Sequence, residues 1–212
     1  MFSFPAFNLS AAMPIILAST SPRRRELLQQ VAVAHTCVSL NIDERQQPQE
    51  LALDYIQRMV SQKAQAALGS LPDNINQAVI ITADTIGVLA NGTVLQKPTD
   101  FADACVMWQQ MSASTHQVWT AVQVSRVEPV ESKKQLVWQK QTTVATAVTF
   151  IELNHDMMQR YWQSGEPADK AGGYAIQGLG AAWVKTINGS YSNVVGLPLV
   201  ETLQLIEEAM TS

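Results

Sequence analysis

Predicted strands and helices alternate along this chain, and this alternation restricts its fold more than any other feature. Short apolar runs at Ile15–Ala18 and Ala78–Ala83 are predicted to be buried strands. Helical stretches at Pro22–Val31 and Pro48–Leu68 lie between these two runs. Such alternation is typical of proteins in which helices cover a sheet. The chain is therefore expected to have an α/β fold.

A hairpin and a long antiparallel pair are predicted in the middle of the chain. The dipeptide Asn91-Gly92 favours a tight turn, so Ile86–Leu89 and Thr93–Leu95 are expected to pair across it. After an intervening helix, alternating apolar and polar residues predict two long antiparallel strands, at Gln117–Val127 and Gln135–Phe150. The hairpin is thus an insertion within the alternating pattern.

Helix caps and glycines organise the remaining segments. Thr99 or Asp100 is suited to cap a third helix, and Asn154 a helix that runs to Gln163. Residues 165–180 hold five of the ten glycines, which predicts a loop with an unusual backbone conformation. The segments expected after this loop are a strand at Ala181–Ile187, a turn at Asn188-Gly189, a return strand at Val194-Val195 and a final helix from Pro198.

The composition narrows the class of protein. With 212 residues, 47% hydrophobic and 15% charged, the chain suits one globular domain or two closely joined lobes. A net charge of −4 does not favour a nucleic-acid surface. The two cysteines, Cys37 and Cys105, have no disulfide or zinc spacing, and no apolar run is long enough for a membrane span. A cytoplasmic protein without nucleic-acid or membrane partners is expected, with residues 1–12 as a disordered extension.

Three arginines occur where a helix should begin. In the stretch ILASTSPRRRELL, Ser21 is the expected cap, and Arg23, Arg24 and Arg25 follow it. Basic groups are mildly unfavourable at a helix N-terminus. By helical spacing, Arg23 and Arg24 lie on the stripe that faces the core. With the Ser-Thr-Ser turn from Ser19, they would form a pocket for phosphate; the alternative is a solvated basic helix end.

Three further charged residues stand out by their positions. Lys63 lies on the apolar stripe of the second helix, so it either points inward or extends along its own methylenes to the surface. Asp84 ends an apolar run, which predicts a carboxylate at the edge of a sheet, where ligands bind, or else a turn or capping residue. Lys97 follows the hairpin, where a plain surface lysine is the alternative. Together, cations for phosphates and an acid for a metal and a water indicate phosphoryl or nucleotidyl chemistry.

Three segments of the chain stand out as possible signature sequences: ILASTSPRRRELL, ADTIGVLANGTVLQKP and GEPADKAGGYAIQGLGAAWVKTINGSYSNVVGLPL. In sequence and in order, they resemble the signature sequences of the Maf family of nucleoside triphosphate pyrophosphatases. The resemblance implies a long, mixed, twisted sheet with flanking helices, in a single two-lobed domain over residues 13–212. A cleft between the lobes and an outline shared with the inosine triphosphate pyrophosphatases are also implied.

The resemblance also implies an activity. The segments NIDERQQPQE and HQVWTAV look most like the branch that hydrolyses dTTP and UTP to the monophosphate and pyrophosphate, a housecleaning role in the nucleotide pool that could extend to modified pyrimidines. A divalent cation, Mg²⁺ or Mn²⁺, and a homodimer are further implications. The alternatives are a 7-methyl-GTP or broad-specificity pyrophosphatase, and a non-catalytic nucleotide-binding regulator of cell division.

Most site residues follow from matching positions in the family, whereas Ser19 is expected from the Ser-Thr-Ser turn and Glu44 from its place next to Asp43. The proton acceptor falls on Asp84, and Lys63 and Lys97 are expected to act with it in catalysis. Ser19 and Arg24 join these lysines in binding phosphate, and the metal is expected at Asp84, Asp43 and Glu44. The positions that separate the branches are Arg23, Thr85 and Gln177. Gln177 is expected to read the base through its amide, or instead only to brace the glycine-rich loop.

Departures from the family pattern affect loops more than side chains of the expected site. Thr82 and Gln96 stand where the family usually has glycine, and AGGYAIQG replaces AGAYGIQG. The three histidines have no partner at ligand spacing and are expected to be structural, and the tryptophans are expected in the core or an interface.

Overall fold

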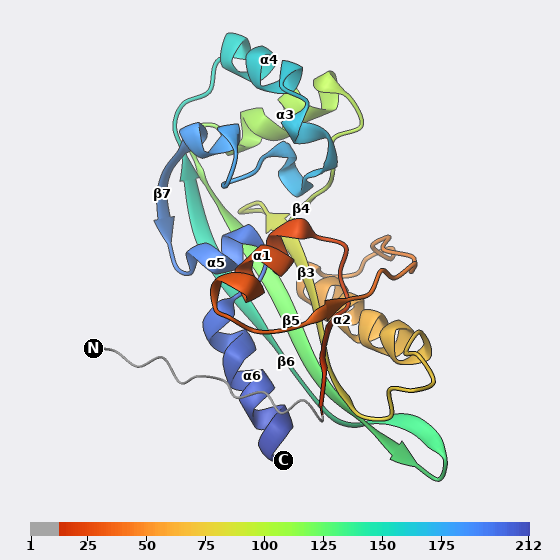
Figure 1. The fold of residues 1–212 in the computed structure, drawn as a ribbon. Coiled ribbons are helices and arrows are strands. Elements are labelled where there is room, and N and C mark those ends of the chain that lie inside the picture. The colour runs from red at the N-terminus through yellow and green to blue at the C-terminus, as the bar shows by residue number, and fades with distance from the viewer. Residues whose placement is uncertain (1–12) are drawn as a thin grey trace, which may run out of the picture.

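A mixed sheet of seven strands forms the centre of the protein (Figure 1). The computed structural model describes residues 13–212 except the side chain of Asp169, so the extension expected at residues 1–12 lies outside the described residues. The strand order is β2-β1-β3-β5-β6-β7, and β4 also pairs with β3. The strands are β1 (Ile15–Leu17), β2 (Thr36–Cys37), β3 (Ala78–Val88), β4 (Val94–Leu95), β5 (Thr115–Val130), β6 (Lys133–Phe150) and β7 (Val184–Asn188).

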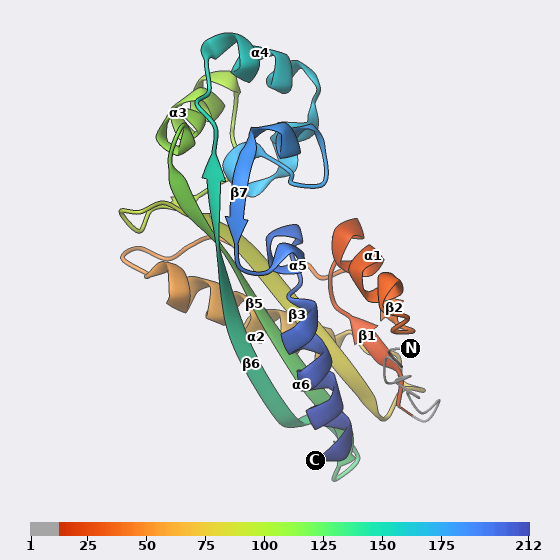
Figure 2. The ribbon, with the colours of Figure 1, turned by 90° about the vertical axis from the view of Figure 1, so that its left-hand side faces the viewer.

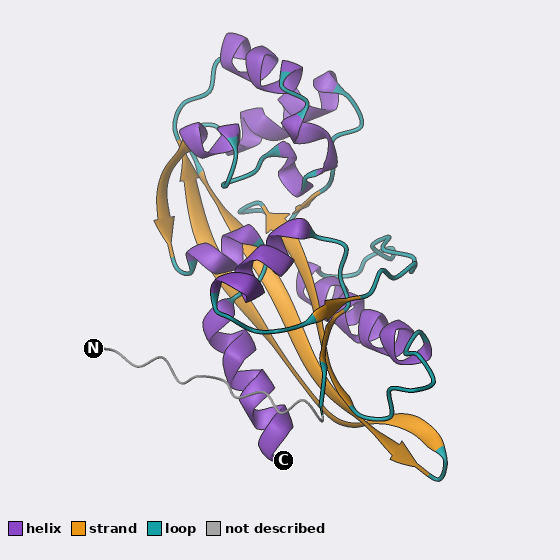
Figure 3. Ribbon diagram, in the orientation of Figure 1, coloured by secondary structure: helices purple, strands orange, loops and turns teal. Residues whose placement is uncertain are grey.

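Helices flank this sheet (Figure 3). They are α1 (Pro22–Gln30), α2 (Ala52–Gly69), α3 (Phe101–Met111), α4 (His155–Gln163), α5 (Tyr191–Val195) and α6 (Leu199–Thr211), with short 3₁₀ segments at Glu166–Asp169, Ala171–Gly173 and Leu179–Trp183. Strand β1 is parallel to β2 and β3, whereas the other pairs are antiparallel. The α/β fold with a long mixed sheet is thereby confirmed. No helix within residues 13–212 has the length and apolar character needed to cross a bilayer.

The two faces of β3 are buried by different helices, which explains its continuous apolar sequence. Val79 and Ile81 belong to the same core cluster as Ile206 of α6. Ile80, on the other face, packs in a cluster with Ala67 of α2. Because successive side chains of a strand point to opposite faces, each residue of β3 faces either α2 or the side of α1 and α6.

Helices α3 and α4 gather with the 3₁₀ segments at one end of β5 and β6, away from α2 and α6 (Figures 1 and 2). Trp108 is fully buried there, with its ring centroid 5.0 Å from that of Trp183 and 5.6 Å from that of Tyr161. The core position expected for these two tryptophans is confirmed. This aromatic cluster supports the glycine-rich segment, because the Trp108 indole donates to the carbonyl of Gly172 at 3.1 Å.

Caps and turns occur largely where the sequence predicts them. The Asp100 side chain accepts from the backbone N–H of Asp103, and that of Asn154 from Met157, at 2.8 and 2.9 Å. Gly92 has a φ of 85° in the predicted hairpin turn. Gly165 has a φ of 75°, in agreement with the unusual backbone expected for residues 165–180.

Three predicted elements differ from the structure. The strand expected from Ala181 begins only at Val184, after the 3₁₀ segment Leu179–Trp183. The strand predicted to end at Ala83 continues through Asp84 to Val88, because β5 pairs with this whole length of β3. Asp84 therefore lies within a strand and not at its end. The return strand predicted at Val194-Val195 is the short helix α5, in which the Ser190 hydroxyl accepts from the N–H of Asn193 at 3.3 Å. A local cap outweighs the β preference of two valines here.

Candidate active site

An interruption along one edge of β3 creates the candidate site. Strand β1 pairs with Val79 to Ile81 and ends there, and β4 pairs only with Gly87 and Val88. Within the described part of the chain, residues 82–86 have no strand partner on this edge. A cleft of about 660 Å³ opens at this gap, lined by the turn that follows β1 and by residues 84–87.

Asp84 and Thr85 approach the cleft from opposite faces of the sheet. Thr82 donates to the carbonyl of Val60 at 2.9 Å, so the face that it shares with Asp84 is the α2 face. Thr85 faces α1, where its hydroxyl oxygen accepts from Arg24 at 3.1 Å. The cleft therefore straddles the free edge of β3.

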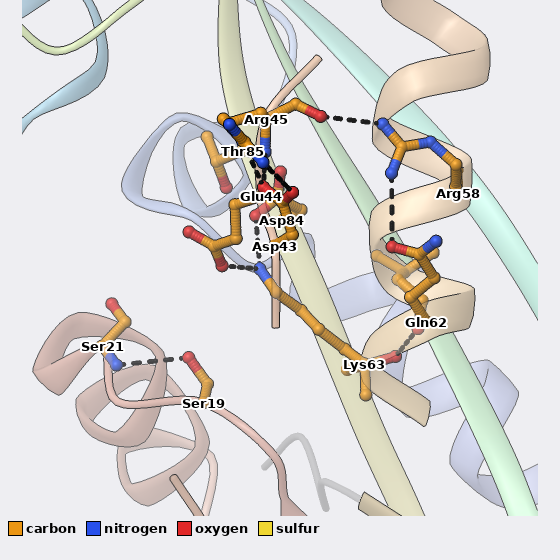
Figure 4. Close-up of polar contacts among 12 residues, drawn as sticks. Ser19, Ser21, Asp43, Glu44, Arg45, Arg58, Gln62, Lys63, Asp84 and Thr85 are labelled. Atoms are coloured by element: carbon orange, nitrogen blue, oxygen red, sulfur yellow. Dashed lines mark hydrogen bonds and ion pairs between the residues drawn. The ribbon is translucent and has the colours of Figure 1, made fainter. Parts of the chain in front are cut away.

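Lys63 brings two carboxylates together on the α2 face (Figure 4). Its Nζ lies 2.6 Å from Oδ1 of Asp84 and 2.8 Å from Oε1 of Glu44, and the residue is 8% exposed. The inward orientation predicted for Lys63 is confirmed. Burial opposes ionisation of Glu44, but the Lys63 hydrogen bond and charge, with the charges of Lys97 and Arg24, lower its pKa overall. A negative charge is thus maintained beside Asp84.

Arg24 is fixed on the other face by three contacts. Its Nε donates to the carbonyl of Gly196 at 2.8 Å, and its two terminal nitrogens donate to Ser19 Oγ and Thr85 Oγ1 at 3.2 and 3.1 Å. Burial lowers the pKa of Arg24, while the charges of Asp84 and Glu44 oppose this effect. A guanidinium has five N–H donors, so this one retains two for a ligand. Arg24 is therefore not part of a solvated helix end, whereas Arg25 is exposed.

Positive charge predominates in the cleft, which suits a polyanionic ligand. Two carboxylates, Glu44 and Asp84, are among the lining residues. The basic residues that line it are Arg23, Arg24, Arg45, Lys63, Lys97 and Lys170. Lys97 is exposed, yet its charge contributes to the lowered pKa of Glu44, which indicates that it acts across the cleft. The structure thus brings Arg23, Lys97 and Thr85 together with Asp84.

Two predicted site residues lie elsewhere. The carboxylate of Asp43 is exposed and paired with Arg45 at 2.7 Å, and this pairing lowers the pKa of Asp43 to about 2. Asp43 lines a neighbouring hollow of about 390 Å³ and not the cleft. Gln177 is exposed and is not among the residues that line the cleft. Arg45 was not expected at the cleft, and its only signal in the sequence is its nearness to Glu44.

One side of the cleft is apolar. Of the lining residues that share one core cluster, we call five the apolar wall: Val118, Tyr174, Ile176, Val194 and Val195. The hydroxyl of Tyr174 lies 2.8 Å from Nε2 of His116, which is buried in the core. The structural role expected for this histidine agrees with its burial. No sequence signal predicts the wall beyond the glycines that shape residues 165–180.

The divalent cation implied by the family fits this donor set. Asp84 and Glu44 contact the same lysine nitrogen, so their oxygens converge on one region. Mg²⁺ in nucleotide sites is typically held by one or two carboxylates together with substrate phosphate oxygens. Among the described residues, no group of three or more histidine, cysteine or acidic side chains could hold a metal without such help. Asp43, the third acid expected at the metal, is directed to Arg45 instead.

Comparisons with known proteins agree with the fold. A protein of Psychrobacter arcticus named dTTP/UTP pyrophosphatase is 52% identical, over 92% of this chain and 95% of its own length. Proteins with the same name from Pseudoalteromonas atlantica and Vibrio vulnificus are 46% and 45% identical, over 91% and 92% of this chain and 95% and 97% of their own lengths. The family model described as Maf-like protein matches residues 14–209. The chain therefore belongs to the Maf family.

Proposed function

We propose that this protein hydrolyses dTTP and UTP to the nucleoside monophosphate and pyrophosphate. The observation that carries this proposal is the placement of Asp84 and Glu44 around Lys63, within a cleft rich in basic residues. An acid pair for a metal and a water, beside cations for a triphosphate, meets the needs of phosphoanhydride cleavage. The names of the relatives support the choice of substrate.

The triphosphate would lie across the free edge of β3. Ser19, Arg24 and the N-terminus of α1 would hold phosphate oxygens from one face, because unpaired N–H groups and two remaining guanidinium donors are available there. Lys63 would hold them from the α2 side, and Lys97, which also lines the cleft, would add a second positive charge. Cations on two sides would neutralise the negative charge that repels an attacking water.

In the reaction, Asp84 would orient a water and accept its proton as the oxygen attacks the α-phosphorus. The bond from the α-phosphorus to the α,β-bridging oxygen breaks in line, and pyrophosphate leaves with that oxygen. Arg24, Lys63 and Lys97 stabilise the charge that moves onto the leaving group. A divalent cation held by Asp84 and Glu44, when bound, supplies charge neutralisation and polarises the phosphate oxygens. Lys63 would shift its contact from the carboxylates to phosphate as this complex forms.

Base selection remains a prediction for Arg23, Thr85 and Gln177. The uracil or thymine edge presents acceptor, donor and acceptor groups, which an amide such as that of Gln177 matches. Thr85 would act through Arg24, to which it is hydrogen-bonded, and Arg23 lines the cleft directly.

The cytoplasmic location and the homodimer also stay predictions.

The test is an assay of pyrophosphate release over the common and modified nucleoside triphosphates. Inorganic pyrophosphatase converts the product to phosphate for detection, and chromatography identifies the monophosphate. We expect the highest turnover with dTTP and UTP, dependence on Mg²⁺ or Mn²⁺, and loss with a chelator. A preference for 7-methyl-GTP or an equal rate with purines would overturn the substrate assignment. Binding of triphosphates without turnover would instead support a regulator.

A further inference from the structure

Glu166 lies at the start of the segment that carries two residues of the apolar wall, Tyr174 and Ile176. Its Oε1 accepts from the Tyr161 hydroxyl at 2.6 Å and from the N–H of Gly180 at 3.1 Å, and its Oε2 accepts from the N–H of Leu179 at 2.8 Å. Tyr161 belongs to α4, whereas Leu179 and Gly180 lie beyond the wall residues Tyr174 and Ile176. One carboxylate therefore joins the two ends of the segment that presents these wall residues.

The fit around this carboxylate is close. A Cβ added at Gly178 would lie 2.1 Å from Glu166 Oε2, so only glycine allows the backbone to approach it. The Tyr161 hydroxyl also accepts from the N–H of Ala175 at 3.2 Å, and a Cβ at Gly180 would lie 2.7 Å from that hydroxyl. The backbone of residues 175–180 is thus held by Glu166 and Tyr161, and a side chain attached at Gly178 or Gly180 could not be accommodated without movement.

The first half of the glycine-rich segment has separate supports. The N–H of Gly172 donates to the carbonyl of Gln96 at 2.9 Å, and the indole of Trp108 donates to the Gly172 carbonyl. Lys170, which lines the cleft on its cationic side, belongs to this half. The hydrogen bonds of Glu166 therefore hold the backbone that carries Tyr174 and Ile176, whereas its carboxylate interacts with Lys170 through charge.

We propose that Glu166 is a positioning residue that sets the shape of the base-facing part of the cleft and so determines affinity for the nucleoside. This inference rests on the proposed function, because it assumes that the apolar wall receives the base while the basic residues receive the triphosphate. A planar, largely apolar base suits a wall of valine, isoleucine and tyrosine side chains. Glu166 does not line the cleft, so it acts through the backbone that it holds.

Glu166→Gln provides the test. The amide keeps the size of the carboxylate, but its NH₂ group cannot accept, so at least one N–H or O–H donor loses its partner. We expect the KM for UTP to rise about tenfold or more, since charge-assisted hydrogen bonds are lost, while kcat changes by less than about threefold. The inhibition constant of inorganic tripolyphosphate, which has no base, should stay within about twofold of the wild-type value.

Hydrogen exchange gives a readout independent of turnover. The amides of Leu179 and Gly180 should exchange faster in Glu166→Gln, whereas the amide of Gly172 should not. Tyr161→Phe removes the hydroxyl that links Glu166 to Ala175, and it should raise KM in the same direction if Glu166→Gln fails to fold. Glu152→Gln changes an exposed acid in front of α4 and serves as the matched control, with unchanged kinetics.

The outcomes separate this inference from the proposed function. If tripolyphosphate inhibits all variants equally and the KM for UTP is unchanged in both Glu166→Gln and Tyr161→Phe, the positioning role is overturned. A parallel loss of UTP and tripolyphosphate binding would also overturn it, because Glu166 would then support the whole site. If tripolyphosphate does not compete with UTP in the wild-type protein, the failure lies in the proposed function.

Discussion

The Nζ atom of Lys63 lies 2.6 Å from Oδ1 of Asp84, and both side chains are largely withdrawn from solvent. A buried ammonium needs a carboxylate partner, and Lys63 has two, in Asp84 and Glu44. Substrate and cation binding must therefore replace contacts that already exist in the free protein. The same pair provides the most direct tests of the proposed chemistry.

Asp84→Asn should abolish most turnover while leaving the fold intact. The amide has the size of the carboxylate but can neither accept a proton from water nor bind a cation strongly, so kcat for UTP should fall about 100-fold or more. Lys63 keeps Glu44 as its counter-ion, which favours normal folding. Pyrophosphate release and thermal unfolding measure the two effects, and an active Asp84→Asn protein would remove Asp84 from its assigned role.

Arg24→Lys should reduce both stability and substrate affinity. A lysine cannot reach Gly196, Ser19 and Thr85 together, because its single ammonium lacks the planar array of donors. The loss of buried hydrogen bonds should lower the free energy of unfolding by about 1–3 kcal/mol. Urea unfolding checks this, with Arg25→Lys as control, since Arg25 is exposed on the same helix. Equal stability of the two variants would contradict the importance of these contacts.

Gln177→Glu tests base recognition. A carboxylate cannot donate to a uracil carbonyl, so turnover of UTP and dTTP should fall by at least about tenfold if this side chain reads the base. The measurement is kcat/KM for UTP, dTTP and CTP, with the exposed Gln163→Glu as control. An unchanged substrate profile would assign recognition to other residues and leave Gln177 as a support of its loop.

Buried His116 should make stability depend on pH. Burial lowers its pKa from 6.5 to about 4, so between these values the unfolded chain binds a proton that the folded protein does not. The free energy of unfolding should therefore decrease as the pH is lowered from about 6.5 towards 4, by at most about 1.4 kcal/mol per pH unit from this residue. Urea unfolding at several pH values should show a smaller slope for His116→Phe. Identical slopes would mean that His116 takes up its proton in the folded state.

Local signals predicted the elements well where one residue decides the backbone conformation. Asn154 and Gly92 are examples, since only a few residue types readily cap a helix or adopt a positive φ. The inward orientation of Lys63 was also predictable, because helical spacing alone places it beside Ile56 and Met59. Val194 and Val195 were assigned wrongly, because a cap at Ser190 and a glycine at 196 outweigh the preference of valine for strands.

The arrangement of the cleft was less predictable, since it depends on contacts between segments far apart in the sequence. The gap between β1 and β4 exists because each of these strands pairs with only part of β3. No local sequence pattern predicts where this pairing ends. The pairing of Asp43 with Arg45 turns the carboxylate away from the cleft, and no sequence pattern predicts this choice of partner. The family resemblance supplied the expectation of a cleft, and its residues Asp84, Lys63 and Arg24 do meet there.

The eleven-residue ladder between β3 and β5 has a consequence for insertions and deletions. Alternation along β3 decides which side chain meets α2, so a shift of one position in this register would exchange the orientations of Asp84 and Thr85. The carboxylate would then face Arg24, and Lys63 would lose its buried counter-ion. The number of residues that precede Asp84 in β3 is thus as important to the chemistry as the identity of the acid itself.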